Sequence, residues 1–230
     1  NYEEYQKLLK VSRARIKKGR GTRVKFDRER LHQFCIFMVG TGLRVDEALQ
    51  LEWEDIRCID RERVVNRQAT ETIVSAYGKD FLSQLERYYL QINVGVSKSR
   101  PHTAYGTGSA YFAYQNLIKL YTSNPQFNCK VGEGTIFKLH SFREGLNSLL
   151  DEADLKFEKL GDSRVKRDSK SFRHTFIQFM LNKGMSSTAI AKMCGTSTEM
   201  IDKYYTSNMA LDTMMDTFNK VKGGHLKIVS

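Results

Sequence analysis

Two arginines and a tyrosine are the residues in this sequence best suited to chemistry on a phosphate ester. Arg44 lies in the stretch TGLRVDEALQLEWEDI, residues 41–56, and Arg173 lies in SFRHTF, 32 residues before Tyr205. A guanidinium group can donate two parallel hydrogen bonds to non-bridging phosphate oxygens, and it stays charged at any working pH. A tyrosine hydroxyl can attack phosphorus as a nucleophile. These residue types therefore indicate phosphodiester cleavage that needs neither a metal ion nor a nucleotide.

The cysteines and histidines show no pattern typical of a metal site. The four cysteines are scattered, with no Cys-x-x-Cys motif and no nearby pair of histidines: Cys35, Cys58, Cys129 and Cys194. Neither a zinc site nor a disulfide framework is predicted from this spacing. We expect reduced thiols in an intracellular protein, and neither a metal nor a cofactor.

The charge of the chain points to its partner. The 230 residues include 37 lysines and arginines against 26 aspartates and glutamates, a formal net charge of +11. Such an excess favours a polyanion. No apolar run approaches the roughly 18 residues that a membrane span needs, and no segment is typical of a signal peptide. We therefore expect double-stranded DNA as the partner and no membrane. Because the first residue is Asn1, we also expect a longer parent chain that was trimmed upstream.

Taken together, the two arginine stretches resemble the catalytic domain of the tyrosine recombinases, the phage integrase family of DNA strand-exchange enzymes. The first is similar to the family's first arginine box, T-G-x-R-x-x-E-x-x-x-L-x-W-x-D. The second continues from SFRHTF through Gly184 and MCGTS to DKYYT. It resembles the second box, in which an arginine helix, a glycine turn and a nucleophilic tyrosine follow one another. The resemblance covers roughly residues 26–210.

The resemblance implies a site-specific recombinase of the integrase or transposon type. Such an enzyme cleaves and rejoins DNA through a 3′-phosphotyrosyl intermediate without metal or ATP, and thereby serves DNA integration or transposition of a mobile genetic element. It also implies a homo-oligomer on DNA, a tetramer in the synapse. For such a protein we expect a cytoplasmic, nucleoid-associated location and a prokaryotic or phage origin.

The resemblance also assigns a role to each matching residue. Tyr205 is the nucleophile, and Tyr204 beside it is the alternative. Arg44 and Arg173 hold the phosphate. Glu47 orients Arg44 through a charge-assisted hydrogen bond.

Two positions of the second box differ from the usual family pattern. Lys170 stands where the family most often has a histidine, and it keeps a proton donor and a positive charge near the phosphate. Thr196, nine residues before Tyr205, stands where the family usually has a second histidine or a tryptophan. Its hydroxyl can donate one hydrogen bond to a phosphate oxygen. We expect His174, next to Arg173, to brace the active-site helix.

The family also has a lysine in a β-turn between the boxes, where it acts as general acid on the leaving oxygen. Lys98 lies in VSKSRP, the most hairpin-like segment, 54 residues after Arg44. Lys79, in YGKD, is the alternative. Both could instead be ordinary surface lysines.

A literal H-x-x-R motif occurs elsewhere in the chain. His140 and Arg143 match it, but Arg143 precedes Tyr205 by 62 residues, whereas Arg173 precedes it by 32. The shorter spacing is close to the family's. We therefore expect His140 and Arg143 to begin a structural amphipathic helix.

Residues 185–201 allow a different class of protein. Their sequence, MSSTAIAKMCGTSTEMI, also resembles a helix-turn-helix with Gly195 in the turn,. The alternative function is therefore a non-enzymatic DNA-binding regulator. A regulator gives no reason for Arg44, Arg173 and Tyr205 to occur in this order.

Hydrophobic periodicity predicts the elements that must position these residues. The basic segment 1–25 is expected to form a helix and a linker along DNA phosphates, followed by a catalytic domain at 26–208. A tail helix within 209–230 is expected to dock on a neighbouring protomer.

Helices are predicted at 26–40, with Asp27 as N-cap, and at 46–53, 70–91, 111–121, 142–150, 172–182, 187–194, 198–205 and 209–221. A strand is predicted at 63–65, a hairpin or three-stranded sheet at 91–105, and an irregular basic stretch at 154–173. The expected fold class is mainly α with a small antiparallel β-sheet.

Overall fold

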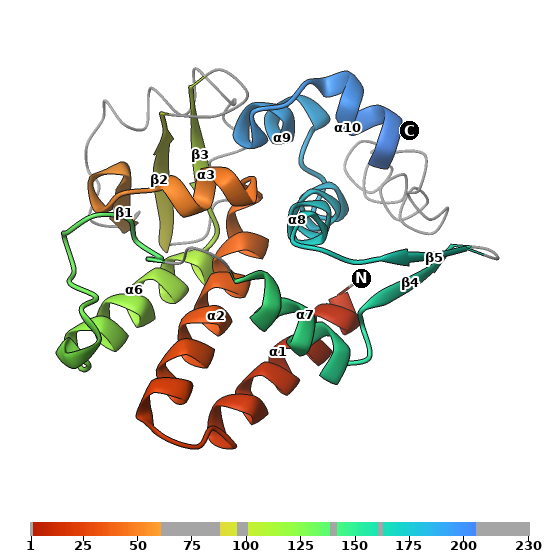
Figure 1. Cartoon of the computed structure of the whole chain (residues 1–230). Helices are drawn as coiled ribbons and strands as arrows, with labels where there is room; N and C mark the ends of the chain where they lie inside the picture. Colours follow the sequence, from red (N-terminus) through yellow and green to blue (C-terminus); the bar gives the residue numbers. More distant parts are fainter. Residues whose placement is uncertain (1, 61–87, 96–100, 139–141, 161–162, 206–230) are drawn as a thin grey trace, which may run out of the picture.

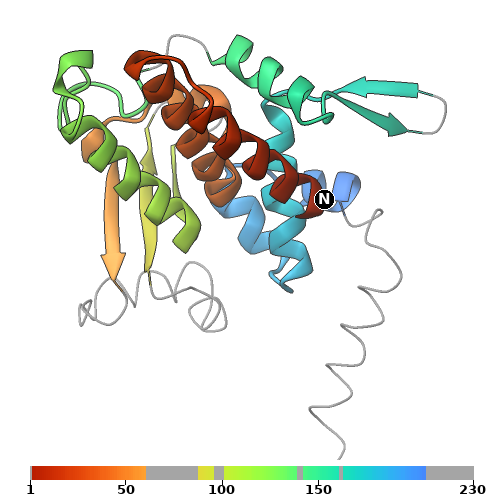
Figure 2. The same cartoon turned by 90° about the horizontal axis from the view of Figure 1, so that it is seen from below.

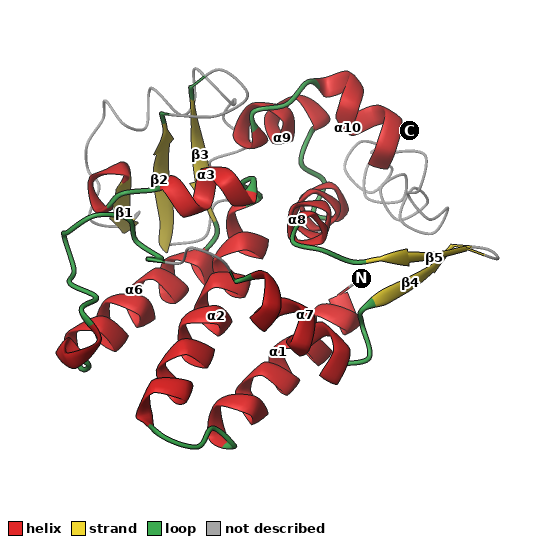
Figure 3. Ribbon diagram, viewed as in Figure 1, coloured by secondary structure: helices red, strands yellow, loops and turns green. Residues whose placement is uncertain are grey.

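The structure, a computed structural model, describes residues 2–60, 88–95, 101–138, 142–160 and 163–205. These residues form a mainly helical body with two small antiparallel sheets (Figures 1 and 3), which confirms the predicted fold class. The helices are α1 (Tyr2–Lys17), α2 (Thr22–Thr41), α3 (Val45–Gln50), α6 (Gly108–Thr122), α7 (Arg143–Glu152), α8 (Lys170–Asn182), α9 (Ser187–Cys194) and α10 (Thr198–Tyr205). Two 3-10 turns, η1 (Trp53–Asp55) and η2 (Pro125–Phe127), accompany them. No helix among these residues is long and apolar enough to cross a membrane.

α2 is the central element of the body. It contacts α1, α6, α7, α8 and the sheet (Figure 1), and every residue of its second half, 31–41, is buried except Ile36. Phe34, Phe37 and Met38 on this helix are completely buried. A helix buried on several sides is expected to be hydrophobic all round. α2 starts before the predicted residue 26, and Asp27 pairs with an arginine on either side of it within the helix instead of capping it.

α1 confirms the helix predicted within residues 1–25, and this helix packs onto the body. Leu8 and Ser12 are 4% and 3% exposed, and the Ser12 hydroxyl lies 3.0 Å from a ring nitrogen of His32 on α2. Arg15 forms an ion pair with Glu152 on α7 at 3.1 Å. Leu8 and Ser12 are four residues apart and share one helix face, so α1 buries that face and exposes its basic residues elsewhere.

The main sheet has the order β1 (Ile56–Asp60), β2 (Tyr88–Val94) and β3 (His102–Gly106), with both pairs antiparallel. Ile92 in the centre of β2 faces Ile56 on one side and Ala104 on the other. Leu90, Ile92 and Val94 are buried at every second position and join the main core. This alternation is what a half-buried strand requires.

These strands test three predictions. The hairpin or sheet predicted at 91–105 is confirmed by the pairing of β2 with β3. The helix predicted at 70–91 is wrong for residues 88–91, which begin β2. The remainder of that segment and the strand predicted at 63–65 lie outside the described residues, as does the tail helix predicted at 209–221.

A second hairpin, formed by β4 (Phe157–Leu160) and β5 (Ser163–Lys166), projects from the body between α7 and α8 (Figure 2). The sequence predicts an irregular stretch here, and this prediction is wrong. The Arg167 backbone N–H donates to the Lys156 carbonyl at 2.9 Å, and the Arg167 side chain pairs with Glu4 on α1 at 2.7 Å. The base of the hairpin is therefore tied to α1 by contacts that are distant in sequence.

α8, α9 and α10 form the last part of the body around a second apolar cluster. Its most buried members, each at most 1% exposed, are Phe176, Ile177, Ile190, Cys194 and Ile201. The three helices coincide closely with the predicted ones. Tyr89 and Tyr105 from the main sheet join the same cluster, so α9 rests against the sheet.

We predict that stability depends on pH through His32. Burial lowers the pKa of its imidazole below the usual value. The unfolded chain then binds a proton more readily than the folded chain, so the free energy of unfolding should fall as the pH drops below about 6.5. Urea unfolding at a series of pH values measures this slope. His32→Gln should make the slope shallower, and an unchanged slope in that variant would contradict the assignment.

Candidate active site

α2 ends at Gly42, and close packing explains why a glycine stands there. Its φ is 66°, and its N–H donates to the Met38 carbonyl at 3.0 Å. A Cβ atom at this position would lie 2.2 Å from Cδ1 of Phe176 on α8. A left-handed backbone with no space for a side chain requires glycine. This glycine allows α8 to reach the start of α3, where Arg44 lies.

Arg44 is held by Glu47, as the sequence predicts. The Arg44 backbone N–H donates to Glu47 Oε2 at 2.8 Å, and Arg44 Nη1 donates to Glu47 Oε1 at 2.7 Å. Arg44 precedes the first residue of α3, so the carboxylate three residues later lies within reach of both groups,. The Glu47 side chain is 2% exposed, whereas that of Arg44 is 32% exposed. A buried carboxylate thus fixes a guanidinium that remains open to solvent.

Arg173 lies in the first turns of α8 and is held by backbone carbonyls. Its Nη1 donates to the Gly42 carbonyl at 2.9 Å, and its Nη2 donates to the Cys194 carbonyl at 2.6 Å. One of these acceptors ends α2 and the other ends α9. Arg173 therefore joins the first arginine box to the turn that leads to α10.

The two guanidinium groups meet at that turn. Arg44 Nη2 donates to the Gly195 carbonyl at 3.0 Å, the residue directly after the Cys194 acceptor of Arg173. We call Arg44, Arg173 and these two carbonyl groups the arginine centre. Burial raises the pKa of the Cys194 thiol to about 11, although both arginines act in the opposite direction. The thiol therefore stays protonated, and the reactive character of the centre comes from its two positive charges.

One residue that sequence reasoning did not single out lies against this turn. His102 is the first residue of β3, and its ring sits so close to Gly195 that a Cβ atom there would lie 2.6 Å from His102 Cε1. The only sequence signal was its place directly after Pro101, at the end of the predicted hairpin. That signal carries no information about a contact with residues 93 positions away.

The two unusual positions of the second box both lie next to the arginine centre in the chain. Lys170 is the first residue of α8, three residues before Arg173, and its backbone N–H donates to Asp168 Oδ1 at 2.8 Å. Its side chain is exposed. Thr196 follows Gly195 directly, and its N–H donates to the Ala191 carbonyl at 2.9 Å. Partial burial and the positive charge of Arg173 lower the pKa of the neighbouring His174.

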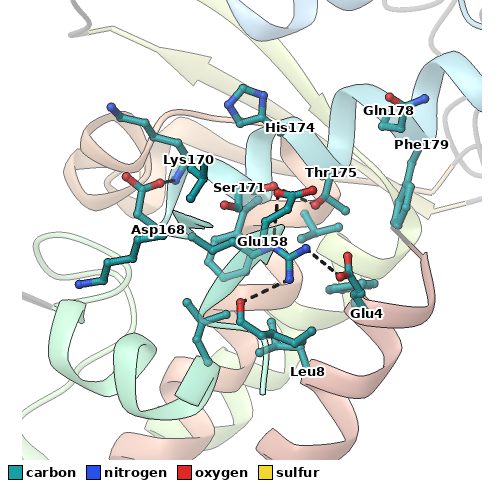
Figure 4. Close-up of a pocket in the computed structure, with 18 residues that line it drawn as sticks. Glu4, Leu8, Glu158, Asp168, Lys170, Ser171, His174, Thr175, Gln178 and Phe179 are labelled. Atoms are coloured by element: carbon teal, nitrogen blue, oxygen red, sulfur yellow. Dashed lines mark hydrogen bonds and ion pairs between the residues drawn. The ribbon is translucent and has the colours of Figure 1, made fainter. Parts of the chain in front are cut away.

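A cavity of about 590 Å³ lies beside this site, between α1, α8 and the β4–β5 hairpin (Figure 4). Lys170 and His174 extend along one edge of it, and Glu4 and Phe179 lie on the side next to α1. Arg44 and Arg173 do not line this cavity, and both side chains are partly exposed.

The remaining predicted site residues are placed only in part. Tyr205 is the last residue of α10, the helix that follows the Gly195 turn, and the side chains of Tyr204 and Tyr205 are outside the described residues. Lys98 is also outside them, in the connection between β2 and β3, as is Lys79 between β1 and β2.

Arg143 of the literal H-x-x-R motif is not part of the arginine centre. Arg143 is exposed and begins α7, which packs on α1 and α2, while His140 lies outside the described residues. The α9–Gly195–α10 segment does form two helices with a tight turn. In this chain the carbonyls of that turn are the acceptors for both arginines.

Solved structures of two recombinases and a transposon integrase share this fold. The XerH recombinase bound to palindromic difH substrate in a post-cleavage complex aligns with a TM-score of 0.60 and 17% identity, over 96% of this chain and 52% of that one. The XerA recombinase aligns with a TM-score of 0.56 and 14% identity, over 96% and 62%. The Tn1549 transposon integrase with transposon right end DNA aligns with a TM-score of 0.54 and 16% identity, over 94% and 63%. This chain thus spans between 52% and 63% of the length of these proteins.

The sequence matches the family model of the phage integrase family over residues 2–210, and the chain belongs to that family. The match confirms the resemblance and includes α1, which lies outside the stretch of 26–210 that the two boxes cover. No curated protein matches the chain.

We predict that Arg44→Ala destabilises the folded protein. The variant leaves the buried Glu47 carboxylate without its guanidinium partner, which should lower the free energy of unfolding by about 1–3 kcal/mol near neutral pH. Adding Glu47→Gln should recover part of this loss because no buried charge remains. Urea unfolding measures both variants, and Arg143→Ala, at an exposed arginine, is the control. Equal stability of Arg44→Ala and the unchanged protein would contradict the assigned ion pair.

Proposed function

We propose that this protein is a site-specific DNA recombinase that cleaves and rejoins duplex DNA through a 3′-phosphotyrosyl intermediate. The observation that supports it most is the meeting of Arg44 and Arg173 on carbonyls of consecutive residues. A phosphate carries a full negative charge and accepts stronger hydrogen bonds than a carbonyl does. A guanidinium has five N–H donors, so each arginine can bind a non-bridging phosphate oxygen while it keeps its carbonyl acceptor.

The catalytic groups of the proposed reaction are side chains of this chain. The Tyr205 hydroxyl gives its proton to water and attacks phosphorus, the P–O5′ bond breaks, and Lys98 gives a proton to the departing 5′-oxygen. Arg44 and Arg173 stabilise the additional negative charge of the pentacoordinate transition state. Lys170 adds positive charge beside them, and Thr196 donates a hydrogen bond to a phosphate oxygen.

Rejoining reverses these steps on a different strand. A 5′-hydroxyl from the partner duplex attacks the phosphotyrosyl bond, and Tyr205 leaves with a proton. The number of phosphodiester bonds is the same before and after, so no nucleotide is needed to drive the exchange.

The proposal includes the partners of the reaction. The formal net charge of +11 suits duplex DNA,. We propose that four protomers on two duplexes exchange strands in pairs and that the tail, residues 209–230, docks on a neighbouring protomer. Such a protein would act on nucleoid or phage DNA during integration or transposition of a mobile element. The helix-turn-helix regulator has no support from the family match or the structural neighbours.

The nucleophile is tested by covalent trapping. A pool of nicked duplexes, randomised around the nick, releases a short 5′-hydroxyl fragment on cleavage, so that the protein stays attached and migrates with the DNA in a denaturing gel. We predict an adduct with the unchanged protein and with Tyr204→Phe, and none with Tyr205→Phe. An adduct that survives Tyr205→Phe but not Tyr204→Phe would move the role to Tyr204. No adduct with the unchanged protein would contradict the enzymatic proposal.

The general acid is tested by a change of leaving group. We predict that Lys98→Ala slows adduct formation by about 10²- to 10⁴-fold on ordinary DNA, as expected for loss of an acid catalyst. A substrate from the trapped pool with sulfur at the 5′-bridging position should restore the rate, because a thiolate leaves without a proton. Lys79→Ala is the matched variant at the other candidate lysine. Rescue of Lys79→Ala, and not of Lys98→Ala, would reverse the assignment.

A further inference from the structure

We infer that His102 is a positioning residue of the proposed active site. Its ring holds the Gly195 carbonyl in place and thereby fixes where Arg44 and Arg173 meet. The inference rests on the proposed function, because the groups that His102 holds in position are the ones that bind the phosphate in that reaction.

His102 packs against Gly195 and leaves no space for a side chain there. A Cβ atom on Gly195 would lie 2.6 Å from Cε1, 2.8 Å from Nδ1 and 3.0 Å from Nε2 of the His102 ring, so the whole ring faces the glycine Cα. Real Cβ atoms do not approach other atoms so closely. The ring thus occupies the space that any other residue at 195 would need for its side chain.

The Gly195 backbone N–H bonds to the Ala191 and Lys192 carbonyls, but no side chain of its own limits its backbone conformation. Its backbone is left-handed, with φ 57° and ψ 49°, at the end of α9. Glycine reaches several other backbone conformations at little cost. A rotation about its backbone bonds would turn the 195 carbonyl away from Arg44 and disturb the adjoining 194 carbonyl, which accepts from Arg173.

His102 is itself well anchored. It begins β3, and it pairs with Val94 across the sheet. By the alternation of a strand it shares a face with Ala104, which is completely buried in the main core,. Nε2 of the ring is also buried, so the ring acts through Gly195 rather than by touching DNA.

The same residue begins the strand that follows the proposed general acid in the sequence. Only three residues separate His102 from Lys98 along the chain. Through His102, β3 contacts the turn of the arginine centre. A shift of the ring would misalign the groups that bind the phosphate without removing any of them.

The test compares a charged with a neutral scissile phosphate. We expect His102→Ala to slow adduct formation by about 10- to 100-fold at saturating protein, as a misplacement of about 1 Å would, and to change DNA affinity by less than about twofold. A methylphosphonate at the scissile position has one negative charge fewer and depends less on the arginines. The His102→Ala defect should therefore shrink on this substrate, as the Arg173→Ala defect should.

His32→Ala is the matched control, since His32 is a buried histidine that bonds to Ser12 of α1 and lies outside the arginine centre. If His32→Ala slows cleavage because less protein is folded, the slowing should be equal on the two substrates.

A second pair of variants tests the contact itself. Gly195→Ala should form the adduct much more slowly, and adding His102→Ala should restore part of its rate, because the ring that collides with the new Cβ is gone.

Two results would overturn the inference. One is a His102→Ala rate equal to that of the unchanged protein. The other is an equal slowing by His102→Ala on the phosphodiester and the methylphosphonate. If the unchanged protein forms no adduct with either substrate, the proposed function fails, and this inference fails with it.

Discussion

The structure depends on a pair of hydrogen bonds between guanidinium groups and consecutive backbone carbonyls. Arg44 and Arg173 are far apart in sequence, and like charges repel when they are brought together. Carbonyl oxygens at the C-terminal end of α9, where the helix dipole is negative, offset this repulsion,. The buried Glu47 carboxylate supplies a full negative charge on the side of Arg44. The fold thus keeps two positive charges close together on side chains that are only partly buried.

This arrangement is possible because the backbone lies directly against an aromatic ring at two glycines. At Gly42 the end of α2 meets the ring of Phe176, and at Gly195 the end of α9 meets the ring of His102. Each glycine combines a left-handed backbone with a lack of space for a side chain. Preorganised donors of this kind stabilise developing charge without having to move during the reaction, so the rigid parts of the fold and the proposed chemistry depend on the same contacts.

Those parts of the fold and of the candidate site that depend on nearby residues could be predicted from the sequence. The Arg44 and Glu47 pair follows from their spacing of three at a helix start, and α8, α9 and α10 follow from apolar periodicity and glycine ends.

Features that depend on contacts distant in sequence could not be predicted in this way. The charge of α1 indicates a segment that lies along DNA, but Leu8 and Ser12 on one face of the helix decide where it packs. Residues 88–91 carry aromatic and apolar side chains that suit a helix or a strand, and only pairing with β1 and β3 selects the strand. The contact of His102 with Gly195 joins segments that are distant in sequence, so no spacing of residues along the chain predicts it.

The central claim is that Arg44 and Arg173 bind one phosphate, and a crystal structure of the protein with the DNA recovered by covalent trapping tests it most directly. We expect nitrogen atoms of both guanidinium groups to lie within about 3 Å of non-bridging oxygens of the same scissile phosphate. Contacts from the two arginines to different phosphates, or from neither to the phosphate nearest α10, would contradict it.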